Sequence, residues 1–564
     1  MSKKASKKPV DTKAAPKVSS NVDSSLNKEI TNLSSIDIFI VGLGLILVVV
    51  ALLRFRLLGI PLERDEGEYA YMGKLILNGI MPYSEAYNMK LPGTYFMYAF
   101  IMLIFGDSYT GIHSGLMVMT LGSIVLLFYA LKQLFNPMIA LVTVASYAIM
   151  SISVNLLGFA AHATHFVVFY IALAFFFYSK FKANQKWFWA GLTGLMFGLA
   201  FLMKQQAVFF ILMGGIIIIA DYVFTKNIDW KNLILNTLTY SVAVFIPYFA
   251  VLGLMYATGN FDKFWFWTIE YASKYAASGV SLDDAKTMFG MSFKPMFDEF
   301  FIVWILAIFG LIFTWVGKYS IQQKIFATCF AIFAFASICP GFYFRQHYFI
   351  VLLPAAGFMA AITMDYLIGL VTAKLNYSLI KILPFVLIIL VGINAIAKGK
   401  QYYLKIKPIQ LCKMIYGTNP FVESVEIAKY IKDHSTPEDK IAVLGSEPQI
   451  LVYADRRSAT GHIYTYGLME IHDYNKKMQQ EMIAEIEAAK PKYLVYCNVR
   501  TSWLPRPGSE MGIFDWYGKY AQSNYDLVGI TDIAPQGQSI SYWDAEAQRQ
   551  PQGQEYILVY RKKG

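Results

Sequence analysis

The chain has 564 residues, of which 56% are hydrophobic, 16% aromatic and only 15% charged. Soluble proteins carry nearer a quarter charged residues, so this composition excludes an ordinary water-soluble protein. The formal net charge of +11 does not indicate nucleic-acid binding, because the lysines gather in an N-terminal tail and in short loops between apolar runs. That placement is typical of the cytoplasmic loops of a membrane protein.

The N-terminal segment, residues 1–33, is rich in Lys, Ser and Ala and has almost nothing to bury. We expect it to be a disordered, basic, cytoplasmic tail. The first apolar run follows and leads into Arg54 and Arg56 without a small-residue cleavage site. We therefore interpret this run as a retained spanning helix and not as a signal peptide.

Roughly eleven apolar runs, at ~20 residues for each span, occupy residues 34–397. Lysines recur in every second loop, which places those loops in the cytoplasm and, with an odd number of spans, places the C-terminus outside. We predict an α-helical polytopic membrane domain. The apolar runs centre near Gly44, Leu121, Ala148, Ala172, Leu195, Gly214, Phe245, Ala307, Ala334, Phe358 and Ile388.

Two larger segments, residues 57–113 and 258–297, lie outside the membrane according to this count. Within the first, Glu68 to Leu77 has helical spacing, and Thr94 to Phe105 is apolar but short for a span. Both are expected to be helices along the membrane surface. The aromatic residues between Phe261 and Trp267 in the second segment are typical of an interfacial anchor.

After Lys398 the composition changes to that of a soluble α/β unit. We predict a small extracytoplasmic α/β domain over residues 398–564, in which amphipathic helices alternate with short buried strands. Helices are expected at Ser424–His434 and Met482–Ala489, and strands at Lys440–Leu444, Tyr493–Tyr496 and Tyr556–Tyr560.

A dense acidic cluster, Glu63 to Glu68, comes directly after the first span. One interpretation is purely structural: Asp65 as the N-cap and Glu68 at the third helical position would form a capping box. The functional interpretation uses the same spacing, because Asp65 and Glu68 share a helix face and a carboxylate there would reach a lipid headgroup at the membrane surface.

Three cations lie on the same side of the membrane as this cluster: Lys90, Lys204 and Arg345. Each could extend its charge toward water or lipid headgroups. Cations at that depth prefer a partner, so together with the acidic cluster they favour a site that binds an anionic leaving group.

Three motifs together resemble a known family: Arg64 to Ala70, Lys90 to Gly93, and Arg345 to Tyr348 followed by Leu353-Pro354. They are similar to the polyprenyl-phosphate-sugar-dependent glycosyltransferases of the GT-C fold (glycosyltransferase family 39-like), relatives of the protein O-mannosyltransferases and the lipid A aminoarabinose transferases. The resemblance covers the whole membrane part. Residues 445–449 and 464–466 resemble the outer domain of bacterial members.

The resemblance implies an inverting transfer on the outer face of a bacterial inner membrane. An acceptor hydroxyl on a lipid, glycan or protein attacks the anomeric carbon of a sugar carried by a polyprenyl phosphate, and the lipid phosphate leaves. Neither a nucleotide nor any other cofactor is required. The implied partners are therefore the sugar-bearing lipid, the acceptor and membrane lipid.

The resemblance also implies roles for individual residues. Asp65 matches the catalytic acidic position, and Glu66 is the second candidate. Lys90, with Lys204 and Arg345, would neutralise the departing phosphate. The supporting positions are Arg64, Glu68, Tyr69, His347 and Tyr348.

Two histidines depart from the family pattern. His162 and His165 lie in an outer loop where relatives often carry Asn or an acidic residue. They could bind a divalent metal with Asp65 or Glu66, and the alternative is that they are two interfacial histidines without a ligand. Lys90 is followed by Leu91-Pro92 where lipid A transferases tend to have two prolines, which disfavours that particular substrate.

Two other classes of protein stay open. A secondary transporter would need ionisable residues at mid-membrane and signs of internal duplication, and neither is evident. A membrane scaffold of cell-envelope assembly would share the topology and leave the acidic cluster to capping alone. The chain has neither a phosphate-binding G-x-x-x-x-G-K-[ST] loop nor an H-E-x-x-H zinc motif, so ATP-driven transport loses its main support.

Overall fold

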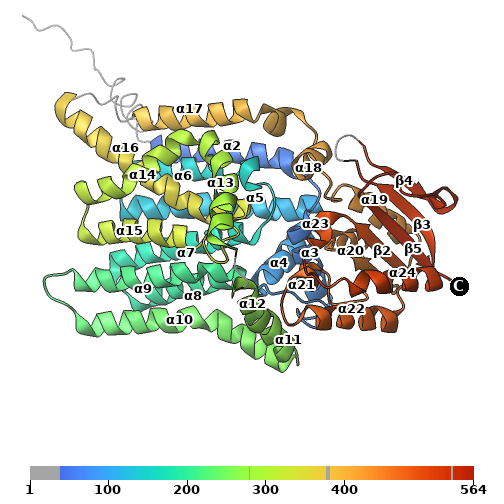
Figure 1. The fold of residues 1–564 in the computed structure, drawn as a ribbon. Coiled ribbons are helices and arrows are strands. Elements are labelled where there is room, and N and C mark those ends of the chain that lie inside the picture. Colours follow the sequence, from blue (N-terminus) through green and yellow to red (C-terminus); the bar gives the residue numbers. More distant parts are fainter. Residues whose placement is uncertain (1–37, 278–279, 376–381, 535–537) are drawn as a thin grey trace, which may run out of the picture.

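The computed structural model describes residues 38–277, 280–375, 382–534 and 538–564. The predicted basic tail, residues 1–33, lies outside the described residues. Figure 1 shows a bundle of long helices packed side by side, with a smaller domain containing the β-sheet at one end of the bundle. The predicted division into a helical part and a C-terminal α/β part is visible in this arrangement.

Every predicted apolar run has its centre in a helix. Within the described residues, six helical segments are long and apolar enough to cross a membrane, or seven if the bent pair α13 (Leu282–Glu299) and α14 (Phe301–Val316) is one span. Several other apolar helices are shorter, so the predicted number of spans stays a prediction. The apolar helices are α2 (Ile38–Leu57), α4 (Gly93–Phe105), α5 (Tyr109–Leu134), α6 (Pro137–Met150), α7 (Ala163–Asn184), α8 (Trp187–Met203), α9 (Val208–Val223), α10 (Trp230–Ala257), α14 (Phe301–Val316), α15 (Ile321–Ala336), α16 (Leu353–Leu375) and α17 (Leu383–Lys398).

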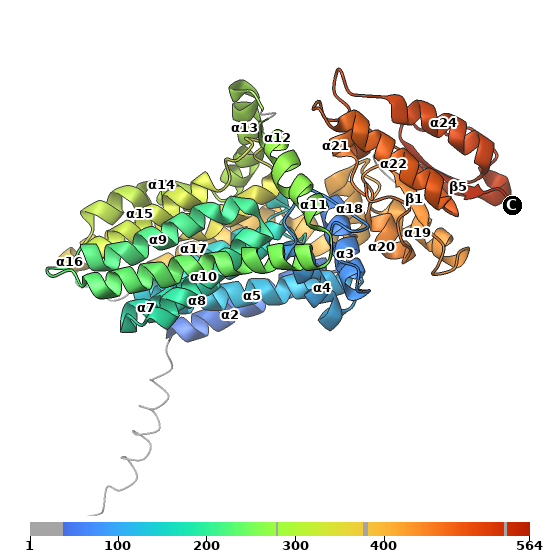
Figure 2. The ribbon, with the colours of Figure 1, turned by 90° about the horizontal axis from the view of Figure 1, so that it is seen from below.

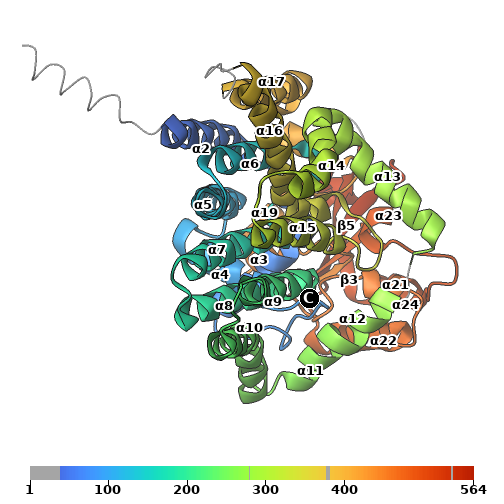
Figure 3. The same ribbon diagram turned by 90° about the vertical axis from the view of Figure 1, so that its left-hand side faces the viewer.

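Small residues set the spacing of the bundle. Figure 3, which looks along the helices, shows α5, α7, α8 and α10 in one row. At the contact of α8 with α10, a Cβ on Gly198 would lie 2.2 Å from the carbonyl oxygen of Val244. Only glycine permits this approach, and close approach through small residues is how helices associate in a membrane, where the surrounding lipid is as apolar as their side chains.

The segments predicted to lie along the membrane surface are helical. The first contains α3 (Arg64–Leu77) and α4, and the second contains α11 (Phe261–Trp265), η3 (Phe266–Tyr271), α12 (Ala272–Ala277) and α13 (Leu282–Glu299). Figure 2 shows α12 and α13 projecting from the bundle on the side where the C-terminal domain lies. Lys263 on α11 forms an ion pair with Glu481, so this segment contacts that domain directly.

The C-terminal domain contains one five-stranded sheet in the order β1-β2-β5-β3-β4. Strands β1 and β2 are parallel, and the other pairings are antiparallel. The strands and helices predicted here are confirmed to within two residues at their ends, except that the helix predicted at Met482–Ala489 begins seven residues earlier, at Asn475. The elements are α18 (Pro408–Tyr416), α19 (Glu423–Asp433), β1 (Ile441–Leu444), α20 (Gln449–Ala454), α21 (Tyr466–Met469), α22 (Asn475–Ala489), β2 (Tyr493–Asn498), α23 (Arg500–Trp503), α24 (Gly512–Asn524), β3 (Tyr525–Asp532), β4 (Ile540–Trp543) and β5 (Tyr556–Lys562).

The loop after β1 joins the sheet domain to the membrane domain. Arg64, at the start of α3, donates from Nε to the carbonyl oxygen of Ser446 (2.5 Å) and from Nη2 to Oε1 of Glu447 (2.5 Å). Both side chains of this ion pair are almost completely buried. The carboxyl end of a parallel strand, where α/β sheets usually bind their ligands, therefore faces the first turn of α3.

Candidate functional site

The first turn of α3 is capped differently from the prediction. The sequence predicted Asp65 as the N-cap, which is wrong: the N-cap is Glu63, whose side chain accepts a hydrogen bond from the backbone N–H of Glu66 (3.0 Å). The Glu66 side chain accepts one from the N–H of Glu63 in return (3.2 Å). Because this capping box satisfies the helix start, the carboxylate of Asp65 is available for other contacts.

Asp65 and Glu68 hold one lysine between them, as their shared helix face predicted. Nζ of Lys90 lies 2.9 Å from Oδ1 of Asp65 and 2.7 Å from Oε2 of Glu68. Tyr95 donates to the buried Glu68 (2.7 Å), and Tyr464 of the sheet domain donates to Asp65 (3.2 Å). Burial opposes ionisation of Asp65, but the adjacent Lys90 ammonium outweighs it and holds the pKa of this carboxyl well below its usual range.

Glu66 points away from this pair and into the protein. Its Oε1 lies 2.8 Å from Nε2 of His113 and accepts a hydrogen bond from the backbone N–H of Ala161 (2.6 Å). The side chain is fully buried. Among the described residues Glu66 does not line the cavity beside Asp65, so of the two candidate catalytic carboxylates only Asp65 faces it.

A cavity of about 250 Å³ opens beside Asp65, between the membrane domain and the sheet domain. Its lining comes from five parts of the chain: the start of α3 with the loop before α4, the loop before α7, the η3–α12 segment, the segment before α16, and the loop that includes α21. Of the predicted site residues, the cavity brings together Arg64, Asp65, Lys90, His162, Arg345, His347 and Tyr348.

Two predicted phosphate-binding cations have surroundings unlike those of Lys90. Nζ of Lys204 lies 3.6 Å from the ring centroid of Tyr348, and Arg345 lines the cavity. Neither takes part in any ion pair with a carboxylate found among the described residues. Burial lowers the pKa of Lys204 to about 7. Arg345 therefore faces the cavity without an acidic partner among the described residues, whereas Lys90 already has two carboxylate partners. Lys204 does not itself line the cavity but lies against Tyr348, which does.

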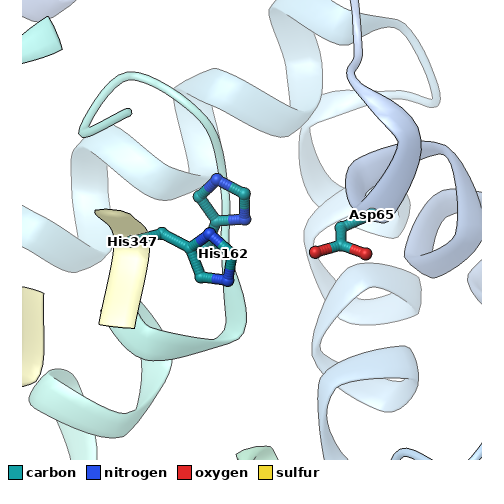
Figure 4. Close-up of side chains that lie close together, drawn as sticks. All are labelled: Asp65, His162 and His347. Carbon is teal, nitrogen blue, oxygen red and sulfur yellow. The ribbon is translucent and has the colours of Figure 1, made fainter. Parts of the chain in front are cut away.

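The histidines form a group with Asp65. The rings of His162 and His347 stack with their centroids 4.0 Å apart, and Figure 4 shows both imidazoles facing the carboxylate of Asp65. Possible ligand atoms of the three residues lie within 4.8 Å of one another. Both ring nitrogens of His162 are buried and have no hydrogen-bond partner among the residues that the structure describes. The predicted metal set paired His162 with His165, but the structure places His347 in that position and leaves His165 outside the group.

The remaining predicted residues surround this constellation. The Tyr69 ring centroid lies 4.6 Å from Nζ of Lys90. Sequence reasoning missed the lining contributed by Trp267, Tyr271 and Glu470. The aromatic run around Trp267 was interpreted only as a membrane anchor, and nothing in the local pattern marks Glu470. The sequence feature that could have indicated Glu470 is the resemblance at residues 464–466, because these residues lie in the loop just before it.

The bundle, the surface helices after its first span and the α/β domain that roofs them define a fold of the GT-C glycosyltransferase type, as the resemblance predicted. ArnT from Cupriavidus metallidurans bound to undecaprenyl phosphate has this fold, with a TM-score of 0.58, 14% sequence identity, and coverage of 93% of this chain and 98% of that chain. The same protein in the apo state gives a TM-score of 0.55 at 14% identity, covering 95% and 98%.

Other comparisons are more distant. An Archaeoglobus fulgidus oligosaccharyltransferase tethered with an acceptor peptide has a TM-score of 0.46 at 12% identity, covering 88% of this chain and 74% of that chain. The family model described as dolichyl-phosphate-mannose-protein mannosyltransferase matches residues 89–252. No curated protein sequence matches the chain. The chain is thus a multi-pass membrane protein with an ArnT-like fold.

Proposed function

We propose that the protein is an inverting glycosyltransferase that moves a sugar from a polyprenyl-phosphate donor to an acceptor hydroxyl. One observation carries the proposal: Asp65 is free of helix capping, is held ionised by Lys90, and faces a cavity that also contains Arg345, which forms no ion pair with a carboxylate in the described part of the chain. The matching ArnT structure has undecaprenyl phosphate bound, which supports a lipid phosphate as the ligand of this cavity.

The geometry supports a single displacement. The acceptor oxygen forms a bond to the anomeric carbon while the bond from that carbon to the phosphate oxygen breaks. Asp65 orients the acceptor hydroxyl and takes its proton late in the reaction, because a carboxylate with a low pKa is a weak base and can remove this proton only after the acceptor oxygen has become positive and its hydroxyl acidic. The bonding electrons leave with the lipid phosphate, whose charge Lys204 and Arg345 stabilise in a partly dehydrated site.

The orientation of the chain belongs to the same proposal. With residues 1–33 in the cytoplasm of a bacterium, the cavity and residues 398–564 lie on the extracytoplasmic side of the inner membrane. The alternation of lysine-rich loops supports this orientation. The acceptor is a lipid, glycan or protein on that side. Transport and scaffolding are disfavoured, because neither explains why Asp65 is left out of the capping box that its neighbours complete.

A divalent metal is a second element of the proposal, and the reaction does not depend on it. Asp65, His162 and His347 would hold the ion, and burial lowers the pKa of His162 to about 4, so that its ring is neutral and able to ligate at pH 7. A bound ion would supply positive charge beside the donor phosphate. We expect His162→Ala to remove stoichiometric Mn²⁺ binding measured by calorimetry. Equal binding by His162→Ala and the wild type would contradict this metal site.

Asp65→Asn tests the proposed function. The variant keeps the size of the side chain but removes the proton acceptor, so we expect transfer to fall by about 10²–10⁴-fold. The measurement is release of polyprenyl phosphate by purified protein, together with mass spectrometry of surface glycans and glycoproteins in a deletion strain complemented with each variant. A matched control is Asp107→Asn, which removes the exposed partner of Lys74 outside the cavity.

Two outcomes would count against the proposal. The first is an Asp65→Asn protein that folds and retains full transfer. The second is a deletion strain whose surface glycans, glycolipids and glycoproteins are all unchanged. Movement of a solute across the membrane that survives Asp65→Asn would instead favour the transporter.

A further inference from the structure

One wall of the cavity comes from outside the membrane bundle. We call it the outer wall and define it as Trp267, Tyr271 and Tyr275 of the η3–α12 segment with Tyr466 and Glu470 of the sheet domain. It contains four aromatic rings and one carboxylate, whereas the wall around Asp65 contains most of the charged groups. The transfer mechanism given above uses none of these five residues.

Contacts between the two parts of the outer wall fix its shape. The hydroxyl of Tyr271 donates to Oε2 of Glu470 (2.8 Å), and the ring of Trp267 lies 5.1 Å from that of Tyr271, centroid to centroid. Tyr466 donates to the carbonyl oxygen of Thr501 (2.6 Å). The wall is thus built from anchored side chains.

The second carboxylate oxygen of Glu470 retains acceptor capacity. Oε1 lies 3.8 Å from Nη2 of Arg506, which is beyond hydrogen-bonding distance. The Glu470 side chain is only 12% exposed. A carboxylate has about four acceptor positions, and a buried one is costly to leave unsatisfied. Because Glu470 lines the cavity, its Oε1 could accept a hydrogen bond from a ligand bound there.

We propose that Glu470 and the aromatic rings of the outer wall form a subsite for an uncharged, hydroxyl-bearing sugar ring. Glu470 accepts a hydrogen bond from a sugar hydroxyl, and the flat face of an aromatic ring packs against the C–H groups of the sugar. Arg506, whose Nη2 lies 3.8 Å from Oε1, offsets part of the charge of Glu470, which favours a neutral sugar over an ammonium group. The inference rests on the proposed function and assigns the sheet domain a part in sugar recognition.

The sugar could belong to the donor or to a glycan acceptor, and the test separates these sources. Its first arm measures by calorimetry the affinity for undecaprenyl phosphate and for the same lipid carrying glucose, mannose, galactose or arabinose. Glu470→Gln should weaken binding of the sugar-bearing lipid by about tenfold and leave binding of the sugarless lipid unchanged, if the donor sugar occupies the subsite. The side-chain oxygen of glutamine can still accept the hydrogen bond from the Tyr271 hydroxyl, so the outer wall should keep its structure.

The second arm compares transfer with donor hydrolysis in cell-envelope extract. If an acceptor sugar occupies the subsite, Glu470→Gln should lower transfer by about tenfold while donor affinity and hydrolysis stay unchanged. Glu481→Gln is the matched control, because Glu481 also joins the sheet domain to the outer helices, through Lys263, but does not line the cavity.

A selective loss of donor affinity would support a subsite for the donor sugar, and a selective loss of transfer would support a subsite for the acceptor sugar. The inference would be overturned if Glu470→Gln matched the wild type in both arms, or if Glu481→Gln produced the same losses, since docking of the domain alone would then explain them. If the wild type turns over the sugar-bearing lipid and Glu470→Gln does so equally well, the subsite is overturned but the proposed function is not. A wild-type protein that turns over none of these lipids overturns the proposed function as well.

Discussion

Asp65 and Glu66 are neighbours in the sequence, but their side chains enter different surroundings. A helix turns about 100° per residue, so the side chains of Asp65 and Glu66 leave α3 in different directions. Asp65 meets Lys90 at the cavity, and Glu66 meets His113 and the backbone of Ala161 inside the protein. Asp65 therefore faces the cavity, where we propose that it acts in catalysis, whereas the contacts of Glu66 support α3.

Lys90 differs from the other two cations in what it can offer a phosphate. Its ammonium is shared by Asp65 and Glu68, so the three groups together carry a net negative charge when both acids are ionised. Breaking such a buried set costs about 3–5 kcal/mol when one partner is removed. We infer that Lys90 mainly holds Asp65 in place, and that Lys204 and Arg345 supply most of the attraction for the leaving group.

Donor affinity should depend on pH through Lys204. Burial lowers the pKa of this lysine to about 7, so its charge is present below that pH and is lost above it. If the phosphate requires the charged form, affinity should fall by about tenfold between pH 6 and 8. Stability should change in the opposite direction: because the unfolded chain binds this proton more tightly, the free energy of unfolding rises from about pH 7 toward 10.

Lys204→Arg provides the comparison. Arginine remains charged throughout this range, so the variant keeps the cation without its titration. Calorimetric titration with undecaprenyl phosphate at several pH values should give a shallower profile for Lys204→Arg than for the wild type. The phosphate's own titration is common to both proteins. Parallel profiles would show that Lys204 does not hold the donor.

At the scale of elements, α3 is one of the contacts between the two domains. Gly67, one turn from the helix start, packs against the first residue of α20. A Cβ at this position would lie 2.6 Å from the backbone nitrogen of Gln449 and 3.0 Å from its Cα. Because both neighbours are backbone atoms, they cannot move aside by a change of rotamer, and the helices themselves would have to separate.

Gly67→Ala should therefore weaken docking of the sheet domain. We expect it to destabilise the protein by about 1–3 kcal/mol and to lower transfer, because the outer wall would move away from Asp65. Thermal unfolding in detergent measures the first effect and polyprenyl-phosphate release the second. Gly44→Ala is the matched control, since no atom lies within 4 Å of a Cβ there. Equal melting temperatures for both variants would contradict this role of Gly67.

At the scale of the whole molecule, hydrophobic runs and their spacing were enough to predict most of the fold. The apolar runs locate the helices of the bundle because a helix in lipid must be apolar along its length, and the strands of the C-terminal domain follow from short buried runs. The paired location of Asp65 and Glu68 on one face of α3 also followed from helical spacing. These are properties of a single element.

What the sequence did not predict depends on contacts between elements. The capping box was placed two residues too late because Glu63 and Asp65 both have an acid three residues further along, at Glu66 and Glu68. The stacking of His162 on His347 joins residues of different loops, and the approach of Glu470 depends on how two domains dock. The periodicity of a single segment does not predict contacts between different elements.

The contacts of Arg64 bear on whether the two domains can be separated. It precedes Asp65 in the chain, and its guanidinium is held by Ser446 and Glu447 of the other domain. Removing the C-terminal domain would thus deprive Arg64, the neighbour of the proposed catalytic residue Asp65, of its counterion Glu447, and would remove one side of the cavity. Because both domains line the cavity, neither domain expressed alone should contain a complete site.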